Sequence, residues 1–139
     1  MKALKTPASR ALATFLAGLF FATLAASSVQ AGMDQPSAAL QQMATIMHRL
    51  KHFPSPQGKQ ALQAIIAAPA SSANERLLAS AMMKLQHKAA ADDKPRLRRI
   101  MDDADAPAAE RELAAIIYHL DHRPSSADKQ KLQGMMQAR

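Results

Sequence analysis

Three histidines are the residues of this sequence whose type and spacing first suggest chemistry. His52, His87 and His122 follow one another at a constant interval of 35 residues. Imidazole can transfer protons or bind a metal ion, and a histidine that follows a helix also suits the negative end of the helix dipole. Packed helices lie about 8–10 Å apart, whereas nitrogens that share a zinc ion each lie about 2.0–2.1 Å from it. We therefore expect the three histidines to line one edge of the fold without meeting at one ion.

Two closer pairs of histidines leave a metal site open as an alternative. His48 and His52 are four residues apart, and His119 and His122 are three apart, so each pair shares one helical face. Two imidazoles supply half of the ligands of a tetrahedral ion, which would be copper, nickel or zinc. The nine methionines add soft ligands, but Met47 is offset by 35 residues from Met82 and by a further 35 from Ile117. Methionine thus shares positions with isoleucine, which indicates a core role.

Basic residues recur with the same interval. Lys59, Lys94 and Lys129 lie near the starts of predicted helices, where the helix dipole does not favour a cation. The middle stretch adds Arg96, Arg98 and Arg99, of which the last two can pair with Asp102 and Asp103. Together with the three histidines, we expect the lysines to form a line of positive groups that binds an anionic partner.

The sequence contains no motif of a catalytic site. It has no cysteine, which excludes a thiol nucleophile, a disulfide scaffold and a zinc–thiolate site. The Gly-x-Ser-x-Gly motif of serine hydrolases, the His-Glu-x-x-His motif of zinc proteases and the glycine-rich motif of phosphate-binding loops are absent too. Helix capping accounts for most of the acidic residues. We expect no enzymatic activity and no cofactor.

The elements that carry these residues repeat along the chain. An offset of 35 residues, without gaps, aligns three units at approximately 37–71, 72–106 and 107–139. Apolar residues recur at helical spacing twice in each unit, and nothing alternates with the period of a strand. Ser55 before Pro56, Ser72 with Glu75 and Ser125 with Asp128 mark helix starts. The sequence predicts an all-α fold of three tandem αα-hairpin repeats, six helices in all, forming a short solenoid or a closed bundle.

The first 31 residues have the composition of a secretory signal peptide. Basic residues precede an uncharged apolar run, and Ser28–Ala31 closes it with small residues. Cleavage after Ala31 would lower the net charge from +7 to +4 and leave one domain, 32–139. An uncleaved anchor is the alternative, although no cluster of positive charge follows the run as a stop signal. We expect a bacterial periplasmic protein without a membrane span after cleavage.

These features predict a secreted, non-catalytic helical-repeat protein that acts as a binding module. Its partner would be a protein or an anionic envelope component such as lipid, lipopolysaccharide or cell-wall polymer, and not nucleic acid. A metal-binding protein that uses the four paired histidines, or a stress chaperone, are the alternatives.

Overall fold

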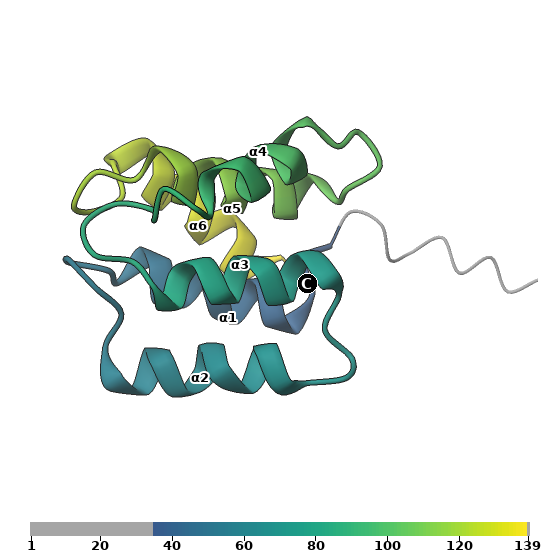
Figure 1. The fold of residues 1–139 in the computed structure, drawn as a ribbon, viewed down its shortest axis with the longest axis horizontal. Helices are drawn as coiled ribbons and strands as arrows, with labels where there is room; N and C mark the ends of the chain where they lie inside the picture. The colour runs from purple at the N-terminus through teal and green to yellow at the C-terminus, as the bar shows by residue number, and fades with distance from the viewer. Residues whose placement is uncertain (1–34, 139) are drawn as a thin grey trace, which may run out of the picture.

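The fold, seen in a computed structural model that describes residues 35–138, consists of six α-helices without a strand (Figure 1). The helices are α1 (Ala38–His48), α2 (Pro56–Ala67), α3 (Ala73–Met83), α4 (Lys94–Asp102), α5 (Ala108–His119) and α6 (Ser126–Gln137). The predicted all-α class is confirmed. None of these helices is long and apolar enough to cross a membrane. The predicted signal peptide, 1–31, lies outside the described residues.

Local sequence signals explain where the helices begin. The Ser55 side chain accepts from the backbone N–H of Gly58, with proline at the next position. Ser72 and Ser125 each form a reciprocal capping box, as predicted. α4 begins differently, because Asp93 makes no capping bond with its side chain. That buried carboxylate instead accepts from Lys84 Nζ at 3.0 Å, which ties the start of α4 to the end of α3.

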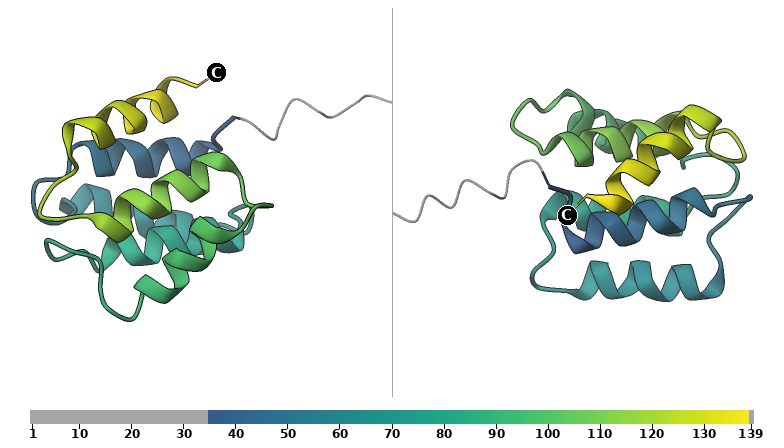
Figure 2. Two further views of the ribbon diagram at one scale, coloured as in Figure 1. Left: turned by 90° about the horizontal axis from the view of Figure 1, so that it is seen from above. Right: turned by 180° about the vertical axis from the view of Figure 1, so that it is seen from behind.

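The helices close into a bundle. α1, α3 and α5 contact one another at the centre, while α2 packs on α3, α4 on α5 and α6 on α1. Figure 2 shows α6 beside α1, so the last helix returns to the first. Gln41 Nε2 also donates to the carbonyl oxygen of Ala138 at 3.0 Å, which joins the two ends of the described chain. Of the two architectures that the sequence left open, the closed bundle is the one observed.

The closely packed pairs differ from the predicted hairpins. We expected α1 to pack on α2, α3 on α4 and α5 on α6, within the units 37–71, 72–106 and 107–139. The extensive contacts instead cross the predicted unit boundaries, between α2 and α3 and between α4 and α5. The connections inside these pairs are only five residues long, and short connections favour antiparallel neighbours. Longer segments follow α1, α3 and α5, and they carry the histidines.

Apolar side chains from all six helices form one core. Leu50, Leu85 and Leu120 are between 2% and 5% exposed, and Met47 and Met82 are fully buried. The methionines that shared positions with isoleucine are therefore core residues, as expected.

A buried polar network joins the first turns of the central helices. Ser37 Oγ, at the start of α1, donates to Glu75 Oε1 on α3. Ser72 Oγ, at the start of α3, donates to Glu110 Oε1 on α5 at 3.1 Å, and Asn74 Nδ2 donates to the other oxygen at 2.7 Å. Glu75 and Glu110 are 5% and 4% exposed. Carboxylates in a first turn are favoured by the helix dipole, so this network can hold the N-terminal ends of α1, α3 and α5 together.

Candidate functional site

The three repeated histidines meet at the opposite ends of the central helices. His52, His87 and His122 follow α1, α3 and α5 by three or four residues. The ring centroids of His52 and His87 are 4.9 Å apart, as are those of His87 and His122, and the remaining pair is 6.3 Å apart. Nδ1 of His52 lies 3.2 Å from Nδ1 of His87. We call these three residues the histidine cluster.

The three rings lie closer together than the expected edge arrangement allows, although their donor atoms are not arranged around one ion. That expectation used the separation of packed helix axes, but the histidines lie beyond the helix ends, where the backbones come together. His87 N–H donates to the carbonyl oxygen of His52 at 3.1 Å, and His122 N–H donates to that of His87 at 2.7 Å. Hydrogen-bonded backbones lie about 5 Å apart, which is half the distance between helix axes.

Two members of the cluster have an unusual backbone conformation. His87 and His122 have φ values of 69° and 63°, in the left-handed region that glycine adopts without cost. A non-glycine residue in such a conformation costs roughly 1–3 kcal/mol. Histidine, like asparagine and aspartate, adopts this region more often than other side chains do, and here the region places two imidazoles in the cluster.

Asp121 is the acidic residue that contacts the cluster. His122 Nδ1 donates to Asp121 Oδ1 at 2.7 Å, and Lys88 Nζ lies 3.6 Å from the same oxygen. The hydrogen bond from His122, followed by the charge of Lys88, lowers the pKa of Asp121 below its ordinary value. The ionised carboxylate accepts the Nδ1–H of His122, and in the neutral form of that ring the lone pair is then on Nε2.

The predicted histidine pairs are not brought together. His48 is half-buried at the end of α1, and His119 packs its ring against Tyr118 with centroids 4.9 Å apart. Among residues 35–138, no ring contact or hydrogen bond joins His48 to His52 or His119 to His122. As the side chains stand in this part of the chain, no group of three or more histidines and carboxylates has its donor atoms arranged around a metal ion.

The three lysines lie on different helices. Lys59, Lys94 and Lys129 are near the starts of α2, α4 and α6, and these helices do not contact one another. The line of positive groups expected from the sequence stays a prediction. Lys94 Nζ lies 5.2 Å from the centroid of the Tyr118 ring, a cation–π contact that gives this lysine a role in the fold. Lys59 lines a small cleft with Phe53 and His87.

The arginines lie on the exposed face of α4. Arg98 Nε donates to Asp102 Oδ2 at 3.1 Å, as predicted, and this bond raises the pKa of Arg98. The expected pair of Arg99 with Asp103 does not form within ion-pair distance in the described part of the chain. Arg96 and Arg99 remain solvent-exposed.

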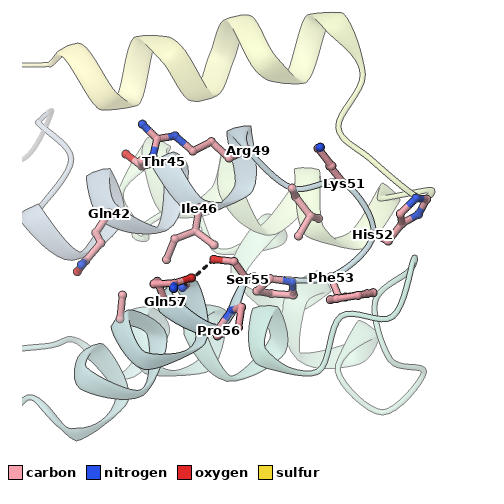
Figure 3. A pocket seen from close by; sticks show the side chains of 14 residues that line it. Gln42, Thr45, Ile46, Arg49, Lys51, His52, Phe53, Ser55, Pro56 and Gln57 are labelled. Carbon is pink, nitrogen blue, oxygen red and sulfur yellow. Dashed lines mark hydrogen bonds between the residues drawn. The ribbon is translucent and has the colours of Figure 1, made fainter.

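Two open hollows lie between α1 and α2, and together we call them the groove. The wider hollow, of about 720 Å³, lies between the end of α1 and the start of α2, and the other, of about 470 Å³, lies towards Ser37. Gln42 lines both parts. Ile46 points from α1 towards Pro56 and Gln57 (Figure 3). A Cβ at Gly58 would lie 3.3 Å from Ile46 Cγ2, so this glycine permits the close approach.

One end of the groove is both apolar and basic. Phe53 is the large apolar side chain that the described residues expose most, at 63%. It stands between the groove and the small cleft that contains Lys59. Arg49, Lys51 and His52 line the wider part of the groove, and no acidic residue does. This end can therefore hold an apolar side chain next to a negative charge.

Sequence reasoning missed several residues of these sites. Phe53 lay outside every helical pattern, and its position in a proline-flanked loop was the available signal. Asp121 aligns with Lys51 and Gln86, so the repeat gave no reason to single it out. The partners of Glu75 and Glu110 lie 36 to 38 residues away on neighbouring helices, which no local pattern could indicate.

Comparisons with protein-family models, with curated proteins and with solved structures find no match for this chain.

Proposed function

We propose that this protein is a secreted, non-catalytic binding module, built from three copies of a 35-residue helical unit, that holds a segment of a partner protein in the groove between α1 and α2. The observation that carries the proposal is the exposed Phe53 at the basic end of that groove. Large apolar side chains beside a hollow are the usual anchors of protein interfaces.

The length of the groove favours a partner segment, helical or extended, that is about as long as three turns of a helix. α1 has 11 residues and therefore a length of about 16 Å. The groove extends from Ser37 at one end of α1 to Phe53 beyond the other. A partner segment with apolar side chains on one face would cover Ile46, as amphipathic helices do in other grooves.

The charge of the groove favours an acidic residue at one end of that segment. Arg49 and Lys51 lie at the Phe53 end, and the described residues around it provide no carboxylate to neutralise them. Complementary charge mainly speeds association, and its effect weakens as salt shortens the screening length to about 8 Å at physiological ionic strength. We therefore propose a protein partner with an acidic and apolar segment, in the periplasm of the producing bacterium.

Site-specific photocrosslinking tests this proposal. With p-benzoylphenylalanine in place of Phe53, the chain should crosslink to one partner in intact cells, whereas the same residue in place of the exposed Gln133 on α6 should not. A synthetic peptide of the crosslinked segment should bind the purified chain, and Phe53→Ala should weaken this binding at least tenfold. Equal crosslinking at both positions would contradict the proposal.

The same experiment separates the alternatives. Crosslinks from Phe53 to many unrelated proteins would indicate a stress chaperone instead of a dedicated partner. Crosslinking to lipid or lipopolysaccharide in place of protein would show that the partner is an anionic envelope component, and would refute the protein segment proposed here.

A further inference from the structure

The histidine cluster, which the proposed groove does not require, brings three potential metal ligands together, two of them with Nδ1 atoms 3.2 Å apart. We propose that His52, His87 and His122 bind one divalent late transition-metal ion, Zn²⁺ or Cu²⁺, on the axis between the ends of α1, α3 and α5. His52 and His87 would bind it through Nδ1, and His122 through Nε2.

The spacing of the first two ligands already fits an ion. Two nitrogens that bind one tetrahedral Zn²⁺ at 2.0–2.1 Å are about 3.3 Å apart. Nδ1 of His52 and Nδ1 of His87 are 3.2 Å apart. In the absence of metal this distance requires one ring to donate its proton to the other, and a metal ion would replace that proton.

The third ring needs only a change of side-chain orientation. The centroid of His122 lies 4.9 Å from that of His87 and 6.3 Å from that of His52, so its ring already borders the same space. The side chains of His122 and Asp121 are 59% and 66% exposed, so the hydrogen-bonded pair has room to turn together. In the described side-chain positions the ligand set is incomplete. Turning of the His122 ring would complete the three-histidine site.

The surroundings of His122 resemble the outer shell of known metal sites. A histidine ligand commonly donates its second ring N–H to a carboxylate, which fixes the tautomer and the direction of the ring. Asp121 accepts such a bond from His122 Nδ1 at 2.7 Å. The C-terminal ends of α1, α3 and α5 precede the cluster, and their partial negative charges favour a cation.

The backbone gives an independent argument. His87 and His122 hold left-handed conformations that glycine would adopt without strain, and their N–H groups are used in the hydrogen bonds that bring the three rings together. Strained conformations at residues with ligand side chains are typical of functional sites. Compared with glycine, histidine gives no advantage to the backbone at these positions, so its imidazole ring is what it contributes.

The positive charge of Lys88 opposes a cation bound at the cluster. The direction in which its removal changes the binding affinity is therefore a test. Lys88 Nζ lies 3.6 Å from Asp121 Oδ1 and is exposed. Removal of this positive charge should strengthen the binding of a cation and weaken the binding of an anion. Lys88→Gln therefore distinguishes a metal site from an anion site made of protonated histidines.

The experiment is a calorimetric titration of the purified chain, without a histidine tag, with Zn²⁺, and an electron paramagnetic resonance spectrum with Cu²⁺. We expect one ion per chain, nitrogen hyperfine structure from three imidazoles, and tighter binding in Lys88→Gln. His52→Gln, His87→Asn and His122→Asn should each weaken binding at least tenfold, and Asp121→Asn should weaken it about tenfold or more. Asparagine tolerates the left-handed backbone, so these variants should fold, as circular dichroism will show.

Histidines outside the cluster serve as matched controls. His48→Gln and His119→Gln should bind Zn²⁺ as the unchanged chain does. The proposal is overturned if neither ion binds at a saturable site, if His87→Asn retains wild-type affinity, if Lys88→Gln weakens binding, or if either control abolishes it.

Discussion

Replacing Glu110 by alanine should lower the free energy of unfolding by about 2–4 kcal/mol. The carboxylate is 4% exposed and accepts hydrogen bonds from Ser72 Oγ and Asn74 Nδ2 at 3.1 and 2.7 Å. A hydrogen bond to a charged group contributes about 1.5–3 kcal/mol, so the two bonds set an upper limit of about 6 kcal/mol. The buried charge loses hydration in the folded state, and water can reach Ser72 once the carboxylate is gone, which brings the net loss down to the stated range.

The assay is urea denaturation followed by far-ultraviolet circular dichroism, with Glu112→Ala as the matched control on the same helix. Glu112 is 38% exposed and pairs with Lys131 at 3.2 Å, so its loss should cost about 0.5 kcal/mol or less. A double-mutant cycle of Glu110→Ala with Asn74→Ala should give a coupling energy of about 1–2 kcal/mol. A coupling below about 0.3 kcal/mol, or equal effects of the two glutamates, would refute the buried network.

Three further predictions concern the core, the cation–π contact and the start of the chain. Leu85→Ala should lower the free energy of unfolding by about 2–5 kcal/mol in the same assay, because this leucine is 2% exposed. A loss under about 1 kcal/mol would mean that Leu85 does not lie in the core. Lys94→Gln should cost about 0.5–1 kcal/mol in the presence of Tyr118 and nothing in Tyr118→Leu, and an equal loss in both backgrounds would exclude the cation–π contact. Mass spectrometry of the native protein should find a chain that begins near Gly32, and intact chains in the membrane fraction would contradict secretion.

The sequence predicted the helices well because their signals are local. Serine caps, prolines at helix starts and apolar spacing act within four residues, and each predicted cap at Ser55, Ser72 and Ser125 forms in the structure. The core leucines followed from the same spacing. These interactions depend on the chain close to each residue and not on how the helices are finally arranged.

The arrangement and the candidate sites depended on long-range contacts that spacing does not specify. The closure of α6 on α1 and the meeting of the three histidines both join residues that lie far apart in the sequence. The distance between helix axes does not apply to His87, because its backbone lies in a loop that is hydrogen-bonded to the loop of His52. The repeat indicated which residues belong together, and only the fold showed where they meet.

The metal site rests on the meeting of His52, His87 and His122, and nuclear Overhauser effects between their rings report this meeting. In a chain labelled with ¹³C only at histidine, five ring spin systems are expected, and His52→Gln, His87→Asn and His122→Asn assign those of the cluster. Centroids 4.9 Å apart predict cross-peaks between His52 and His87 and between His87 and His122, with none from His48 to the cluster. A folded, well-dispersed spectrum without cross-peaks between the three rings would contradict the closed arrangement and the site built on it.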